Sequence, residues 1–244
     1  MRFYDAHLHL PTPDAAGVDA LLRFLESEPG LLGGNLILNT AEEVAVAESN
    51  LHRLPPTVAL IPYFEPEIRH SEPLCRSGWC KIHPIIQELE AEAIPNFIPS
   101  LRETNPRGII VHCFPWGTEL RFNTSLVLVM ELARNLPDSI ILATHAGGYE
   151  SWMFRAHAGG LRNVHFDFSL TLEYYEGADL LRPLQRYLRF SQDRIHFGSD
   201  WPSGNVKRQL DEMIRLAEEA GMGREELETL LLDNAQCFGV ISST

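Results

Sequence analysis

The stretch MRFYDAHLHL, residues 1–10, decides how the whole chain is interpreted. It is a short, largely apolar run of the kind that forms a β-strand, and His7 and His9 stand two residues apart in it. Side chains two apart on a strand point to the same face, so the two imidazoles can bind one metal ion together. One exposed and one buried histidine would fit the same spacing, and the rest of the chain must decide between these interpretations.

Similar apolar runs recur along the chain and alternate with helical segments. We predict eight strands, over Arg2–His7, Asn35–Asn39, Thr57–Pro62, Trp79–His83, Gly108–His112, Ile140–His145, Val164–Asp167 and Arg194–Ser199. We predict helices over Val18–Glu28, Ala41–Arg53, Pro84–Ala93, Thr124–Asn135, Tyr149–Ala158, Glu176–Tyr187, Asn205–Ala220 and Arg224–Asn234. The segment Tyr63–Gly78 is rich in proline and charge, and we expect it to be a long loop.

This alternation favours an α/β fold with a single (β/α)8 TIM barrel, and we expect residues 1–244 to form one domain. A doubly wound open sheet would alternate strands and helices in the same way. Three further residues can bind a metal: His112 and His145 end the fifth and sixth predicted strands, and Asp200 directly follows the eighth. They can meet the first strand only if the eighth strand returns beside it, which a barrel provides.

The composition of the chain indicates which classes of binding partner it can have. Hydrophobic residues make up 45% of the chain, which is typical of a packed core, and the formal net charge of -13 disfavours nucleic acid and anionic membranes. No apolar run reaches membrane-spanning length, and we expect no signal peptide. Four cysteines without a CxxC pair indicate a reduced, cytoplasmic protein. The partner we expect is a small-molecule substrate.

Each strand-end residue also fits an ordinary structural role. A lone histidine after an apolar strand is commonly a hydrogen-bonded core residue, and Asp200 fits a helix cap. The coincidence at four strand ends favours a metal site, because imidazole and carboxylate groups gathered at one rim bind divalent ions. His165, Asp167 and His196 also lie on predicted strands, and we expect them to be polar residues of the barrel interior.

Five segments together resemble the amidohydrolase superfamily, and most closely its amidohydrolase 2 branch of small metal-dependent hydrolases and decarboxylases with a TIM barrel. They are DAHLH (5–9), KIHP (81–84), VHC (111–113), ATHAGG (143–148) and FGSDWP (197–202), and the end of the last helix, LLLDNAQCFG (230–239), is similar too. The resemblance implies that His7, His9, His112 and Asp200 hold one divalent metal ion, for which we expect zinc. It also implies that His145 stands beside the reacting water or the substrate carbonyl.

The proposed roles agree with general chemistry. Asp200 can accept a proton from the activated water, and His145 titrates in the range suited to an acid or base, so we predict both as catalytic residues. Lys81 and His83, two apart on the fourth strand, are our predicted substrate-binding residues. Lys81 has three interpretations: a carbamylated bridge to a second ion, an ammonium that binds a substrate carboxylate, or a solvated lysine at a strand end.

We therefore expect a metal-dependent hydrolase in which metal-activated water attacks the amide, ester or lactone carbonyl of a small molecule. A non-oxidative decarboxylase of an aromatic or unsaturated acid would use the same ligands. A metal-dependent nuclease on a similar barrel is disfavoured, because resemblance to that branch would require an acidic residue on the fourth strand, where this chain has Lys81. A non-catalytic metal- or ligand-binding barrel is the alternative from a different class of function.

Overall fold

A computed structural model describes residues 1–239, and all eight predicted strands are present, with shifted ends in every strand except the seventh. They are β1 (Phe3–Leu8), β2 (Leu31–Leu38), β3 (Val58–Pro62), β4 (Trp79–Ile82), β5 (Gly108–Val111), β6 (Ile140–Ala143), β7 (Val164–Asp167) and β8 (Ile195–His196). Every paired strand runs parallel to its neighbour. Parallel strands need long crossovers, and helices fill them.

The strands close into a barrel. Ladders β1–β2–β3 and β4–β5–β6–β7–β8 meet at two seams. At one seam Tyr63 bridges Lys81, and at the other Leu8 bridges Trp201. The backbone N–H of His9 donates to the carbonyl of Trp201 at 2.8 Å, so the chain after β8 lies directly beside the end of β1. This return of the last strand to the first confirms the TIM barrel and rules out the open sheet.

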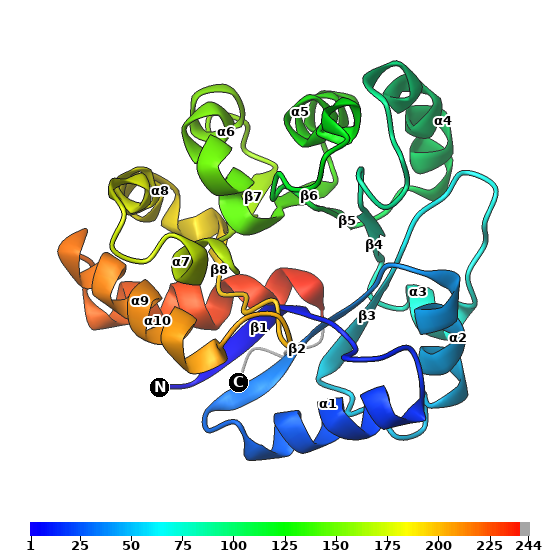
Figure 1. Cartoon of the computed structure of the whole chain (residues 1–244), viewed down its shortest axis with the longest axis horizontal. Helices are drawn as coiled ribbons and strands as arrows, with labels where there is room; N and C mark the ends of the chain where they lie inside the picture. Colours follow the sequence, from blue (N-terminus) through cyan, green and yellow to red (C-terminus); the bar gives the residue numbers. More distant parts are fainter. Residues whose placement is uncertain (240–244) are drawn as a thin grey trace.

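Helices surround the ring of strands on the outside (Figure 1). They are α1 (Ala15–Ser27), α2 (Ala41–Ser49), α3 (Glu72–Cys75), α4 (Ile94–Thr104), α5 (Ser125–Asn135), α6 (Ser151–Ala158), α7 (Thr171–Tyr174), α8 (Arg182–Ser191), α9 (Val206–Glu219) and α10 (Arg224–Leu231). Short 3-10 segments join them: η1 (Ala91–Ala93), η2 (Leu120–Phe122), η3 (Thr144–Glu150), η4 (Asp179–Leu181), η5 (Gln192–Arg194) and η6 (Asp233–Phe238). None of the described helices is both long and apolar enough to cross a bilayer.

Three predicted segments differ from the structure. The helix predicted over Pro84–Ala93 is wrong, because the helix after β4 is α4, which begins at Ile94 and contains Pro99. A proline at the first turn is tolerated in a helix, but one in the interior is a signal against a helix, and none was predicted over this segment. The helix predicted over Glu176–Tyr187 is replaced by α7 and α8, separated at Gly177, whose φ is +74°. The predicted loop Tyr63–Gly78 contains the short α3.

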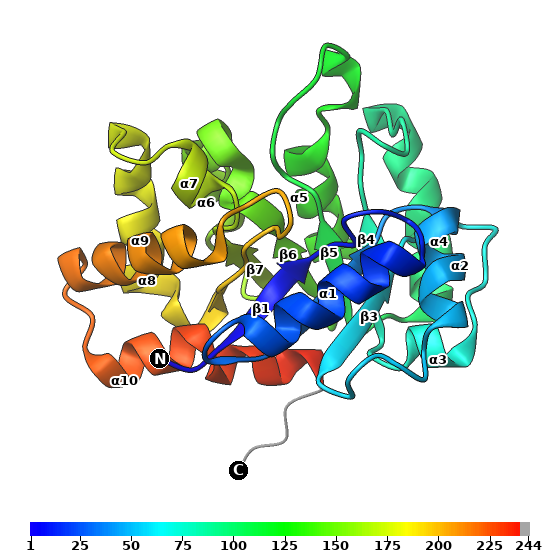
Figure 2. The same cartoon turned by 60° about the horizontal axis from the view of Figure 1, so that its bottom comes forward.

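One apolar cluster fills the inside of the barrel. Its residues come from β1 to β6 and from η6, and they can meet only in the interior: Tyr4, Ala6, Ile37, Ala59, Ile61, Trp79, Ile110, Leu142, Ala235 and Phe238. The ring of Phe238 lies 5.7 Å from that of Tyr4 and 4.6 Å from that of Trp79. Trp79 begins β4, so η6 closes the amino-terminal end of the barrel, where α10 and η6 cross beneath the strands (Figure 2).

Strand β1 is irregular, and this irregularity helps to build the site. Its pairing with β2 shifts register between Phe3 and Asp5 and again between Asp5 and Leu8. Strict alternation would place Tyr4 and His7 on opposite faces. Because of the shifts, Tyr4 packs in the inner cluster while His7 also faces inward, against β7.

Candidate metal centre

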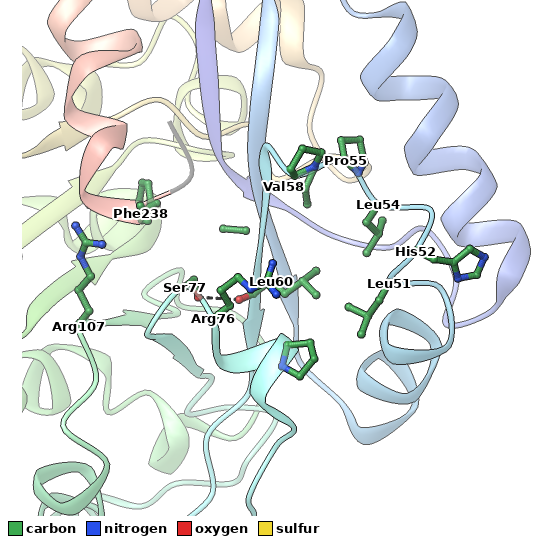
Figure 3. A pocket seen from close by; sticks show the side chains of 14 residues that line it. Leu51, His52, Leu54, Pro55, Val58, Leu60, Arg76, Ser77, Arg107 and Phe238 are labelled. Carbon is green, nitrogen blue, oxygen red and sulfur yellow. Dashed lines mark hydrogen bonds between the residues drawn. The ribbon is translucent and has the colours of Figure 1, made fainter. Parts of the chain in front are cut away.

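The predicted site residues gather at the carboxyl ends of the strands. A cavity of about 410 Å³ opens there. Its lining residues are His9, Asn39, Glu43, Lys81, His83, His112, Phe114, Trp116, Leu170, Tyr174, Asp200 and Ser203. A larger cavity of about 560 Å³ begins beside Val58, the first residue of β3, and extends to Arg76 and Phe238 (Figure 3). None of the predicted site residues lines that second cavity, so the smaller one is the candidate active site.

His7, His9 and Asp200 converge at the wall of this cavity. Nε2 of His7 lies 3.1 Å from Nε2 of His9 and 3.2 Å from Oδ1 of Asp200, and Nε2 of His9 lies 3.4 Å from the same oxygen. His7 is fully buried, whereas His9 is half-buried and reaches the cavity. Three ligand atoms so close to one another form a compact group that can hold one cation.

Asp167 orients His7 from inside the barrel. Its Oδ2 accepts a hydrogen bond from Nδ1 of His7 at 3.2 Å. The other ring nitrogen of His7, Nε2, then has a free lone pair that points toward His9 and Asp200. Its Oδ1 accepts from the backbone N–H groups of His145 and Ser169, each at 3.0 Å, and from the Ser169 hydroxyl. Burial alone would raise the pKa of Asp167, but His7 and these hydrogen bonds hold it below its ordinary value. Burial lowers the pKa of His7 to about 4, so this imidazole is neutral, as a metal ligand must be.

The imidazole of His9 can adopt the same tautomer. The side-chain amide of Asn39 lies 3.3 Å from Nδ1 of His9, and Oδ1 of Asn39 is buried without a partner. With that oxygen turned toward Nδ1, it accepts a hydrogen bond from the Nδ1–H group of His9, which leaves Nε2 of His9 with a free lone pair. Two lone pairs and the carboxylate of Asp200, whose pKa lies below its ordinary value despite burial, then face one point. Such a group is repulsive without a cation, and its nitrogen and oxygen donors suit zinc.

His112 and His145 form a second group beside the first. Nδ1 of His145 lies 3.0 Å from the carbonyl of Ser169 and can only donate to it, so Nε2 of His145 accepts from Nδ1 of His112 at 3.3 Å. Nε2 of His112 lies 3.0 Å from the carbonyl of Phe114 and 3.2 Å from the indole N–H of Trp116, which can donate to it. The ring of His145 also lies 4.8 Å from that of His7. His112 lines the cavity, and His145 lies behind it, buried.

The backbone places these side chains by unusual turns. His145 has φ +58° and Asp200 has φ +59°, both in the left-handed region that residues other than glycine rarely occupy. The N–H of Asp200 donates to the carbonyl of His7 at 2.9 Å, which fixes the turn after β8 against β1. Buried Asp5 strengthens this seam, since its Oδ1 accepts from the backbone N–H groups of His7 and Ser199 at 3.0 Å and 2.9 Å. Strained backbone of this kind is common at functional sites.

The family is settled by sequence comparison. The profile of the family described as Amidohydrolase matches residues 6–238. The chain belongs to the amidohydrolase family. No curated protein matches this amidohydrolase in sequence.

Several solved structures share the fold of this amidohydrolase. An uncharacterised TIM-barrel protein from Bordetella bronchiseptica has a TM-score of 0.70 at 12% identity, covering 98% of this chain and 100% of that one. A dihydroorotase from Campylobacter jejuni has a TM-score of 0.66 at 15% identity, covering 100% of this chain and 84% of that one. An amidohydrolase from Burkholderia multivorans with bound zinc has a TM-score of 0.64 at 17% identity, covering 98% and 99%. At these identities the likeness concerns the fold.

Lys81 belongs to β4 and His83 directly follows this strand. Both residues line the cavity, on the side opposite to β8 and Asp200. Lys81 is fully buried, and its Nζ has no hydrogen-bond partner. Burial lowers the pKa of Lys81 to about 8. The ring of His83 stacks on that of His112, with centroids 3.9 Å apart. The solvated interpretation of Lys81 is therefore wrong, because the ammonium lies inside the barrel.

Two residues of the site were not predicted from the sequence. Asp167 was expected only as a polar interior residue, and Ser169 carried no expectation. Asp167 ends β7 and Ser169 follows it, and within β7 the carboxylate of Asp167 stands two residues after His165. That alternation signals an inward-facing polar strand. It gives no sign that Asp167 meets His7, because the contact joins residues that are 160 positions apart.

Proposed function

We propose that this amidohydrolase is a zinc-dependent hydrolase of a small molecule with an amide, ester or lactone carbonyl. The proposal rests above all on the convergence of His7, His9 and Asp200 at the cavity wall, with Asp167 behind them. A divalent ion held by these residues and by His112 would supply Lewis acidity, which activates water and polarises a carbonyl group. The four residues lie at the carboxyl ends of the strands, where the active sites of TIM-barrel enzymes are found.

The surrounding residues supply proton transfer. Asp200 is ionised, and one of its oxygens already lies against His7 and His9, so its carboxylate can accept a proton at the cavity wall. His145 is neutral, because burial lowers its pKa, and its Nε2 lone pair faces His112. A proton accepted at Nε2 of His145 would be stabilised by the nearby carboxylates of Asp167 and Asp200. We assign the acid–base role to His145 and the first proton acceptance to Asp200.

The cavity limits the class of substrate. Its volume of about 410 Å³ suits a small molecule. Phe114, Trp116 and Tyr174 give it an aromatic side, and Lys81 gives it a buried positive group without a protein partner. A substrate with an apolar or aromatic part and a carboxylate would satisfy both. We propose that Lys81 binds this carboxylate, with His83 beside it.

Lys81 also supports the second candidate, a non-oxidative decarboxylase of an aromatic or unsaturated acid. Such an enzyme must bind a carboxylate next to the metal, and the unpartnered ammonium provides that contact. Carbamylation of Lys81 would instead favour a second ion. For both candidates we propose a cytoplasmic protein without nucleic-acid or membrane partners, in keeping with the net charge of -13 and four free cysteines.

The two reactions are separated by their products. Zinc-loaded protein is incubated in ¹⁸O-labelled water with panels of lactones, amides, esters and unsaturated carboxylic acids. Incorporation of the label without release of CO2 supports hydrolysis, and release of CO2 supports decarboxylation. His7→Ala should abolish either activity together with the bound ion. Turnover that survives in His7→Ala would contradict both proposals, because neither can proceed without this ligand.

A further inference from the structure

A second group of metal-binding side chains lies at the other end of the barrel. His165 is the second residue of β7, His196 ends β8, and Cys237 belongs to η6. One ligand atom of each residue lies within 4.8 Å of those of the other two. These three residues have no part in the catalytic proposal, and they come from three separate elements.

The two histidines are already paired. Nδ1 of His165 lies 2.9 Å from Nε2 of His196, and their rings are nearly parallel, 19° apart. Neutral imidazoles can share one proton across this contact, so one ring donates and the other accepts. The remaining nitrogen of His196, Nδ1, is buried and has no hydrogen-bond partner. A buried polar atom without a partner is uncommon in folded proteins, and here it belongs to a histidine that is grouped with a cysteine.

Cys237 is held against the pair by η6. Its backbone carbonyl accepts from the indole N–H of Trp79 at 3.3 Å, and the neighbouring Phe238 packs inside the barrel, with its ring 5.2 Å from that of His196. Cys237 and His165 are half-buried, while His196 is only 1% exposed. An ion can therefore reach the group from solvent, and the ligands come from well-packed elements.

We propose that His165, His196 and Cys237 form a second metal site, for zinc, which fastens η6 to β7 and β8 at the floor of the barrel. Imidazole nitrogen and thiolate sulfur are both donors that zinc binds, and a water molecule can complete a tetrahedral shell around two imidazoles and one thiolate. Ligand atoms in such a shell lie about 3.5 Å apart. The three side chains need only a small inward movement from the 4.8 Å limit that contains them.

Binding changes the state of one group. It forms bonds from the metal to two neutral nitrogens and to sulfur, breaks the S–H bond of Cys237, and releases that proton to solvent. Burial raises the pKa of Cys237 to about 12, so the metal-free protein carries a thiol. The positive charge of Arg107 favours the thiolate and assists the exchange.

The two sites are chemically distinguishable. The catalytic group contains only nitrogen and oxygen donors, whereas this lower group contains sulfur. The interior apolar cluster, with Ile110 and Leu142, fills the barrel between its floor and its upper rim. A metal bound to Cys237 therefore gives a spectroscopic signal that the upper site cannot give.

The test uses Co²⁺ titrated into the reduced, metal-free full chain. We expect about two ions per chain and, with one of them, a near-ultraviolet thiolate-to-cobalt charge-transfer band. Cys237→Ser should lose this band and about one ion, and His165→Gln should weaken cobalt binding at least tenfold. Cys75→Ser is the matched control, since Cys75 is exposed and far from Cys237 in the sequence. His7→Ala should keep the band and lose the other ion.

Each outcome of the cobalt titration either supports or overturns the proposed lower site. Absence of the band in the wild-type chain at millimolar Co²⁺ overturns the proposal without any variant. A band that survives in Cys237→Ser assigns the sulfur to another cysteine and overturns it as well. Loss of the band in Cys237→Ser together with its retention in His7→Ala supports the lower site whatever becomes of the catalytic proposal.

Discussion

Replacement of Asp167 by Asn is the sharpest test of how the upper site is built. Asn is nearly isosteric with Asp but offers one acceptor and one amino group. The Oδ1 position must accept from two backbone N–H groups and a hydroxyl, so the amide oxygen of Asn will occupy it. The amino group then faces Nδ1 of His7, where Oδ2 accepts at 3.2 Å in the wild-type chain.

This exchange forces His7 into the wrong tautomer. Nδ1 must give up its proton to accept from the new amino group, and Nε2 then carries the proton instead of the lone pair that would bind zinc. Loss of a group that orients a metal-bound histidine typically weakens metal binding about 10- to 100-fold. We therefore expect Asp167→Asn to raise the Kd for Zn²⁺ by that factor, which corresponds to about 1.4–2.7 kcal/mol.

The Kd is measured by competition with a chromophoric chelator in the Cys237→Ser background, which removes the proposed lower site from the titration. Asp193→Asn is the matched control, because Asp193 is exposed and belongs to η5. The control should bind zinc as the parent does. A folded Asp167→Asn protein with the parent's Kd would refute the reasoning, since His7 would then need no orienting carboxylate.

Three further predictions test the remaining parts of the structure. Elemental analysis beside kinetics should show that His112→Asn loses bound metal, whereas His145→Asn keeps it and loses turnover by about 100-fold or more; the reverse pattern would exchange the two roles. For a carboxylate-bearing substrate, kcat/KM should fall above pH about 8, because Lys81 then loses the charge that binds it, and Lys81→Arg should move this decline to higher pH; a decline at the same pH would exclude Lys81. Phe238→Ala should lower the free energy of unfolding by about 3–5 kcal/mol in urea denaturation, because its side chain is fully buried in the inner cluster; a loss below about 1 kcal/mol would contradict the role of η6 as a plug.

The barrel could be predicted because its strands are short apolar runs whose period is visible locally. The positions of His112 and Asp200 at strand ends followed from the same runs. Helix α4 was missed for the opposite reason: Pro95 and Pro99 are poor local signals for a helix that tertiary packing of Ile98 and Leu101 stabilises.

The internal order of the site could not be predicted. His145 and His112 look alike in the sequence, each after an apolar strand, yet His145 lies behind His112 because the chain turns with positive φ immediately after β6. Likewise, the contact between Asp167 and His7 depends on the register shifts in β1. Such shifts result from the packing of neighbouring strands and leave no periodic trace in the sequence.

Strand β7 connects the two proposed metal sites. His165 and Asp167 are two residues apart, so both face the interior, one toward the floor and the other toward the upper rim. Because both belong to a strand paired on each side, their positions are rigid. In contrast, Asp200 follows β8 at a left-handed φ of +59°. The upper ligands therefore combine a fixed histidine, oriented by β7, with a carboxylate on a strained turn. The hydrogen bond from the N–H of Asp200 to the carbonyl of His7 fixes that turn against β1, so both ligands are held in place before an ion binds.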